Sequence, residues 1–272
     1  MTTPSPQPRP ERQVYWREAA ILWVAGMVGV LAVIPYQLTL TQVDLTALGV
    51  PMWAMWVGAA FQNGILVAAA VLAGLWFARR AGLSVPVLEA WLRREPLPRR
   101  WGTLLKWAIP LGVGSALLII LLDGLVFSRA LLEGGLEPGV AHPPAWQGLL
   151  ASFYGGITEE LFLRLFLMSA LAWLLGRVWA GADGLPTPGA MWTANVVAAV
   201  LFGLGHLPAT AALVALTPFV VLRAVVLNGI VGVACGWLYW RKGLEMAMAA
   251  HFHADIVLHV LLPLLTPLLA GS

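Results

Sequence analysis

The chain has 272 residues, of which 60% are hydrophobic and only 11% are charged. A soluble domain carries about 25% charged and about 45–50% apolar residues, so this composition excludes an ordinary soluble protein. It predicts an all-α, polytopic membrane helical bundle. The net charge of +3 comes mostly from arginines in loops between apolar runs, which indicates contact with anionic lipid headgroups rather than with nucleic acid. The single cysteine, Cys235, excludes a disulfide framework and a thiolate metal cluster.

The N-terminal part of the chain divides into a polar tail and two apolar helices. Residues 1–16 hold four prolines and no apolar periodicity, which predicts a flexible cytoplasmic tail before a single transmembrane domain at 17–272. The apolar segment from Ala19 to Tyr36 is long for a signal peptide and no clean cleavage site follows it, so a retained first helix is expected. A second helix is expected from Met52 to Ala78.

The rest of the chain alternates apolar runs with short polar loops. The arginine-rich loop after Arg80, with Leu88, Trp91 and Leu92 interleaved, predicts a short interfacial helix. Asp123 lies near one end of the third run and is interpreted as interfacial, and His142 as a loop histidine. Later helices are predicted at about 105–127, 146–175, 190–206, 209–226, 229–239 and 244–270. We therefore expect about eight transmembrane helices, or seven if the short runs merge or one of them re-enters.

Loop charges predict the orientation of the bundle. Basic residues in the tail and after the second helix, against acidic or neutral loops elsewhere, place the N-terminus in the cytoplasm. With eight crossings, the Arg241-Lys242 pair would fall on the opposite side, against the same rule. A re-entrant segment among the fifth to seventh runs would remove this conflict. The compact size and short loops favour the inner membrane of a bacterium.

Two adjacent carboxylates, Glu159 and Glu160, stand inside the fourth apolar run with Arg164. An ionisable group near the bilayer centre costs at least ~2.5–3.5 kcal/mol, so such residues usually pair inside the bundle and mark a functional site. In an α-helix Glu160 and Arg164 share one face at i,i+4, while Glu159 points about 100° away. The spacing predicts that Arg164 neutralises Glu160 and leaves Glu159 for another task.

Histidines supply the remaining candidate chemistry. His251 and Asp255 are also at i,i+4, so Asp255 can accept from one imidazole nitrogen and fix the tautomer at the other. His206 closes the fifth helix, whereas His253 and His259 are interpreted as core or lipid-interface contacts. Polar residues can also hold transmembrane helices together, but Ser, Thr and Asn would do this at lower cost. We therefore expect the acidic and imidazole groups to converge on a hydrated cavity.

Other intramembrane protease chemistries lack their residues in this sequence. There is no HExxH for a zinc protease, no serine in a GxSG setting and no GxGD for an aspartyl protease. A glutamate-based hydrolase remains, in which a carboxylate activates water and imidazoles share its proton. A proton-coupled transporter that uses the same groups as a relay also remains open.

The three polar motifs together resemble those of a known superfamily. Glu159-Glu160-x-x-x-Arg164, Phe202-x-x-x-His206 and His251-x-x-x-Asp255, in this order, are similar to the motifs of the CPBP superfamily. That superfamily includes the CAAX prenyl endopeptidase and bacterial bacteriocin-processing or Abi proteins. The resemblance covers about residues 145–260, which would be the catalytic core.

The resemblance implies a role for each motif residue. Glu159 and His206 would activate the attacking water, while His251 and Asp255 would stabilise the oxyanion. Glu160, Arg164 and Phe202 would have supporting roles. The family commonly has Asn at the position of Asp255, and an ionised Asp cannot donate to an oxyanion. We therefore expect Asp255 to orient a cationic His251 that donates instead.

The sequence thus predicts an intramembrane endopeptidase without a cofactor. Its substrate would be a membrane-associated peptide or protein segment, such as a prenylated C-terminus or a leader peptide. Zinc held by Glu159, His206 and His251 is the less favoured alternative, because those ligand types suit zinc. The alternative functions are a non-catalytic immunity or regulatory protein that binds a partner, and the proton-coupled transporter.

Overall fold

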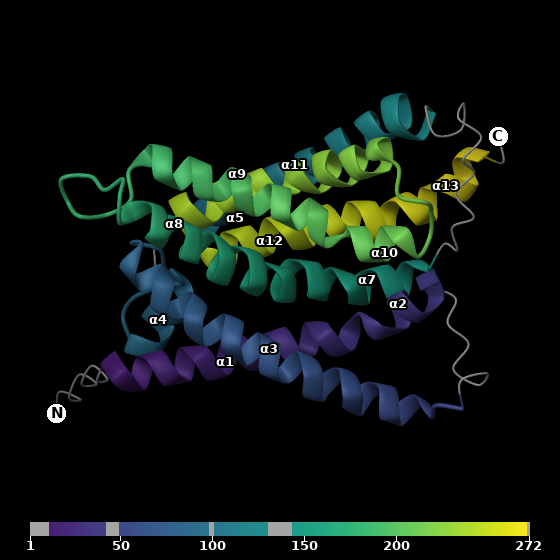
Figure 1. Cartoon of the computed structure of the whole chain (residues 1–272). Helices are drawn as coiled ribbons and strands as arrows, with labels where there is room; N and C mark the ends of the chain where they lie inside the picture. The colour runs from purple at the N-terminus through teal and green to yellow at the C-terminus, as the bar shows by residue number, and fades with distance from the viewer. Residues whose placement is uncertain (1–10, 42–48, 98–100, 130–142, 271–272) are drawn as a thin grey trace.

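The chain folds as a bundle of long helices that run side by side (Figure 1). The computed structural model describes residues 11–41, 49–97, 101–129 and 143–270. Within these ranges the structure is helical and contains no strand beyond one isolated bridge between Ala180 and Pro186. The predicted all-α membrane bundle is confirmed.

The first three passes are formed by the N-terminal helices. Helix α1 (Glu11–Ala32) leads directly into α2 (Ile34–Thr41), and α3 (Met52–Arg80) returns along it. The short helix predicted after Arg80 is present as α4 (Pro86–Arg93). Helix α5 (Trp101–Leu122) then continues in the π-helical segment η1 (Asp123–Phe127).

The fourth pass carries the glutamate pair and is helical without a break from residue 145 to residue 176. It consists of α7 (Ala145–Phe153), η2 (Tyr154–Glu159), η3 (Leu161–Met168) and α8 (Ser169–Gly176). Its middle is π-helical rather than the α-helix that the sequence predicts. Short π-helical segments inside α-helices occur frequently at functional sites.

The C-terminal passes are α9 (Pro188–Gly205), α11 (Pro218–Lys242) and a last pass made of α12 (Leu244–Asp255), η4 (Ile256–Leu261) and α13 (Leu262–Ala270). The short helix α10 (Leu207–Ala211) connects α9 to α11. Thr187 and Thr217 start α9 and α11, because each hydroxyl accepts from a backbone N–H three residues on and each is followed by proline.

Of the two helix counts predicted, eight or seven, the part of the chain that the structure describes agrees with seven, because the two short runs merge. The two runs expected at 209–226 and 229–239 are replaced by the single helix α11. Proline is unfavourable inside a helix but favourable at its first position, so Pro218 begins α11 instead of lying within the earlier run. Gly229, which lies between the two predicted runs, does not interrupt α11, and a Cβ at this position would meet open space.

Six helical segments are long and apolar enough to cross a membrane, and the continuous helical run 145–176 lies among them (Figure 1). The six are Gln13–Thr41, Met52–Arg80, Lys106–Phe127, Pro188–Ala211, Pro218–Lys242 and Leu244–Thr266. The chain is therefore a multi-pass membrane protein, and its described residues form seven passes.

Seven passes also remove the conflict over the Arg241-Lys242 pair. The start of α12 contacts α4, because Glu245 Oε1 accepts from the Val87 and Leu88 amides at 2.9 Å. Leu244 N also donates to the O atom of Ser84, just before α4, at 3.2 Å. The basic end of α11 therefore lies at the same end of the bundle as Arg79 and Arg80, which close α3.

One prediction near the ends of the bundle needs correction. Helix α1 begins at Glu11, so the polar tail that was predicted to reach residue 16 ends earlier, and residues 1–10 lie outside the described chain. Asp123, which was interpreted as interfacial, is paired with Arg223, because both its oxygens accept from this side chain, at 2.6 and 2.7 Å. His142 lies outside the described residues.

Candidate active site

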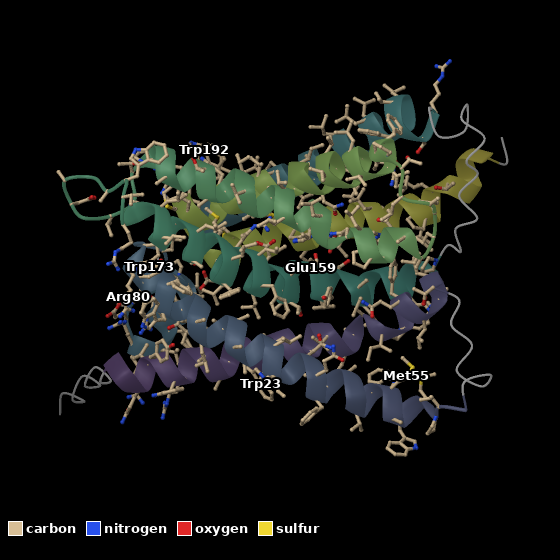
Figure 2. All side chains as sticks on the ribbon, viewed as in Figure 1. Trp23, Met55, Arg80, Glu159, Trp173 and Trp192 are labelled. Atoms are coloured by element: carbon tan, nitrogen blue, oxygen red, sulfur yellow. The ribbon has the colours of Figure 1, made fainter. Side chains whose placement is uncertain are left out.

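The three sequence motifs meet at one place between the helices. Glu159 and Glu160 come from the π-helical part of the fourth pass, His206 from the C-terminal end of α9, and His251 and Asp255 from α12. Figure 2 shows Glu159 about midway between the two ends of the bundle. Residues that are up to 96 positions apart in the chain thus form one cluster of acids and imidazoles.

Glu160 is the structural member of the glutamate pair. It is fully buried, and Arg164 Nε lies 3.4 Å from Glu160 Oε2. Arg164 is 1% exposed and also donates to Gly232 O at 2.9 Å, which ties the fourth pass to α11. The ion pair that the spacing predicts is present, and a buried charge needs such a partner.

Glu160 has a second partner that the sequence did not predict. His251 Nδ1 lies 2.8 Å from Glu160 Oε1, a hydrogen bond between α12 and the fourth pass. Asp255 was expected to orient this ring, but Asp255 Oδ1 is 3.8 Å from His251 Nε2, too far for a direct hydrogen bond. Glu160 therefore fixes the orientation of His251, and its Nε2 faces the cluster.

Glu159 lies between two imidazoles from different helices. Its Oε1 is 3.9 Å from His206 Nε2, and its Oε2 is 3.7 Å from His251 Nε2. The Glu159 side chain is 19% exposed and that of His206 is 35% exposed, in contrast to the fully buried Glu160. At these distances a water molecule can bridge the carboxylate and the two imidazoles.

His206 is held by its own helix. Its Nδ1 lies 2.9 Å from Phe202 O, and a carbonyl oxygen only accepts, so Nδ1 carries the proton. In the neutral ring Nε2 is then a free acceptor directed at Glu159. Phe202 also packs edge-on against both His206 and His251, with ring centroids 4.7 and 5.6 Å apart, which gives this motif residue its supporting position.

Asp255 lies beside His259, which was interpreted from the sequence as a core or lipid-interface contact. His259 Nε2 is 3.9 Å from Asp255 Oδ1, and Tyr36 Oη is 3.2 Å from His259 Nδ1. His253 instead folds back onto its own helix, with Nδ1 2.6 Å from Ala249 O. Only His259, and through it α2, extends the cluster, and no sequence pattern connects residues 36 and 259.

Glycines let the fourth pass approach α12 closely. A Cβ at Gly155 would collide with the Asp255 carboxylate, and one at Gly156 would lie 2.8 Å from Phe252 Cβ. On the other side Thr158 Oγ1 donates to Gly26 O of α1 at 2.8 Å. The small residues before the glutamate pair thus set the distance between Glu159 and the α12 residues.

Among the described residues, only Glu160, Cys235 and His251 bring three candidate metal-ligand atoms within 4.8 Å of one another. This trio does not suit a cation, because the Arg164 guanidinium adjoins Glu160 and the Cys235 thiol donates to Ala247 O at 3.6 Å. Glu159, His206 and His251 have ligand types that suit zinc, and metal at that set stays a prediction.

The fold and the cluster define a multi-pass membrane protein with acids and imidazoles gathered between its helices. Residues 141–257 match the family model of the type II CAAX prenyl endopeptidases, Rce1-like. The matched segment contains all three motifs, and the match agrees with the CPBP superfamily that these motifs resemble. Comparison with curated proteins and with solved structures gave no significant match.

Proposed function

We propose that the chain is an intramembrane endopeptidase that hydrolyses a peptide bond with water activated by Glu159 and His206. The observation that carries the proposal is the position of the Glu159 carboxylate, 3.9 Å from His206 Nε2 and 3.7 Å from His251 Nε2. The family match to CAAX prenyl endopeptidases supports the same reaction class.

Glu159 and His206 form the proposed base. Glu159 takes a proton from the bound water, and the oxygen attacks the carbonyl carbon of the scissile bond. His206 Nε2, free because Nδ1 is bonded to Phe202 O, accepts the proton in turn. The proton then passes to the leaving amine as the carbon–nitrogen bond breaks, so one water is consumed and two peptides are released.

His251 and Asp255 form the proposed oxyanion side. Glu160 occupies Nδ1 of His251, so a second proton on this ring must be at Nε2, which faces the cluster. A cationic His251 can then donate from Nε2 to the developing oxyanion. Asp255, 3.8 Å from this nitrogen, adds a negative charge on the same side of the cluster, while Glu160 holds the orientation of the ring. No step in this scheme requires a metal.

The proposed substrate is a peptide that reaches the site from the membrane. The family name points to a prenylated C-terminal segment, which a lipid-embedded site could meet in the bilayer. The alternative substrates for the same reaction are a leader peptide and a segment of another membrane protein. In each case the substrate's apolar part would stay in lipid while its scissile bond reaches Glu159.

The proposal is tested with purified protein and a panel of prenylated and unprenylated peptides in water enriched in oxygen-18. Mass spectrometry should find two fragments, with one heavy oxygen in the new carboxyl terminus. The Glu159→Ala and His206→Ala variants should remain folded and produce no fragments. Retained cleavage in either variant would contradict the assigned roles, and cleavage without oxygen-18 would contradict hydrolysis.

A further inference from the structure

A groove lies away from the glutamate–histidine cluster, at the end of the bundle where α1 begins and α4 ends. It has a volume of about 420 Å³ and is formed by α1 on one side and α4 with its C-terminal cap on the other. Figure 1 shows α4 beside the start of α1 at this end. The lining residues are Arg17, Ala20, Ile21, Trp91, Leu92 and Arg94.

The groove carries two positive charges without a protein counter-ion. Arg17 and Arg94 are both exposed, and in the described chain neither has a carboxylate within ion-pair distance. By contrast, Arg79 at the same end is paired with the buried Glu18 at 2.7 Å. Guanidinium groups bind phosphate oxygens in bidentate geometry, so the open pair suits a phosphate-bearing ligand.

The backbone of Arg94 supports a ligand role for this residue. Arg94 is the C-cap of α4 with φ 60° and ψ 30°, and it is the only non-glycine residue of positive φ in the described chain. Glycine adopts this left-handed conformation without a steric cost and is the usual residue after a helix. An arginine here keeps a cation in the groove at a position where glycine would be less strained.

Beyond the two arginines the groove becomes apolar and continues into the membrane-facing side of α1. Arg17, Ile21, Val24 and Val28 follow one another at helical spacing, and the last three are 37%, 54% and 53% exposed. Trp91 is 61% exposed, and tryptophan is typical of the headgroup level of a bilayer. A cationic entrance above an apolar track fits a headgroup with an acyl chain.

We infer that this groove binds one anionic phospholipid, with the phosphate between Arg17 and Arg94 and an acyl chain along Ile21, Val24 and Val28. Charge complementarity selects the anionic headgroup over a zwitterionic one, and the apolar track selects a lipid over a free phosphate. The site does not depend on the proposed peptidase reaction. It would anchor α4, and with it the adjoining start of α12, at the lipid surface.

Native mass spectrometry of the detergent-purified full chain, titrated with phosphatidylglycerol, tests the inference. Wild-type protein should retain one phosphatidylglycerol in preference to phosphatidylcholine. The Arg17→Gln/Arg94→Gln variant should bind it about thirtyfold more weakly, because each cation near a lipid surface contributes about fivefold. The matched control is Arg177→Gln, a single-cation loss at a residue stacked on Trp173 outside the groove.

Two further arms separate lipid binding from its alternatives. Arg94→Gly should weaken lipid binding about fivefold while the melting temperature stays constant or rises, whereas a merely structural Arg94 would show a lower melting temperature. Soluble glycerol phosphate should not displace the lipid. The inference is overturned if the double variant binds like wild type, if Arg177→Gln loses as much affinity, or if glycerol phosphate competes as well as the lipid.

Discussion

The two adjacent glutamates have different environments, and this difference is the main finding at the scale of single residues. Glu160 is enclosed by Arg164 and His251, whereas Glu159 keeps a partly exposed carboxylate between two imidazoles. The division was predictable because helical spacing puts only Glu160 beside Arg164. The bond from Glu160 to His251 was not, because it joins residues 91 positions apart whose helices the sequence does not place together.

We predict that the two glutamates differ in what their removal does. Glu160→Ala should destabilise the protein by about 3–5 kcal/mol, because it leaves the buried Arg164 guanidinium without its counter-ion. Glu159→Ala should change the free energy of unfolding by less than about 1 kcal/mol, since its carboxylate has no hydrogen bond in the described structure. Thermal unfolding in detergent measures both, and equal melting temperatures would refute the division.

Asp255 offers a second prediction. Because an amide can donate directly to an oxyanion, Asp255→Asn should keep cleavage within about tenfold of wild type. Asp255→Ala should lower kcat by about 100-fold or more, as loss of an oxyanion-stabilising group does. The comparison of kcat for the two variants checks this, and an Asn variant as inactive as the Ala variant would contradict the place of residue 255 on the oxyanion side.

At the scale of the elements, the long helices were predictable and their interruptions were not. Apolar length and flanking charges located α3, α5 and the fourth pass within a few residues. The merger of two runs into α11 could have been read from Thr217-Pro218, a helix-start pattern inside a predicted helix. The π-helical turns around the glutamate pair have no comparable sequence signal.

We predict that the contact between η2 and α12 is required for activity. Gly155→Ala places a Cβ against the Asp255 carboxylate, so α12 must shift, and a shift of about 1 Å at a catalytic site costs about 100-fold in rate. Gly229→Ala in α11 is the matched control, because its Cβ would meet open space and alanine favours helix by about 1 kcal/mol. Cleavage assays of both variants, each with a melting curve, decide the matter; equal activities would count against this contact.

At the scale of the whole molecule, α1 begins and α13 lies at opposite ends of the bundle (Figure 1). Arginines and lysines at Arg79-Arg80 and at Arg241-Lys242 close α3 and α11 at one end, and Figure 2 shows Arg80 there. This end also adjoins the start of α1 in Figure 1. The hydropathy of the sequence predicts a membrane protein. It does not predict which passes pack against each other, because those contacts join helices that are far apart in the chain.

We predict that the basic end faces the cytoplasm, since cytoplasmic loops carry the excess of Lys and Arg. Reporter fusions measure this directly: a reporter active only in the cytoplasm should work at the N-terminus, and one active only outside it should work at the C-terminus. If the reporters place both chain ends on the same side of the membrane, the number of crossings is even. If they place the N-terminus outside and the C-terminus in the cytoplasm, the loop charges do not set the orientation.

The most direct test of the account is the rate of peptide cleavage by wild-type protein and by Glu159→Gln, each with and without a chelator. Glutamine keeps the size of the side chain but cannot take a proton from water, so the rate should fall by at least about 100-fold, within the usual range for loss of a general base. The wild-type rate should be unchanged by the chelator. Cleavage by Glu159→Gln at the wild-type rate, or activity that is lost to the chelator and restored by zinc, would contradict a glutamate-activated water.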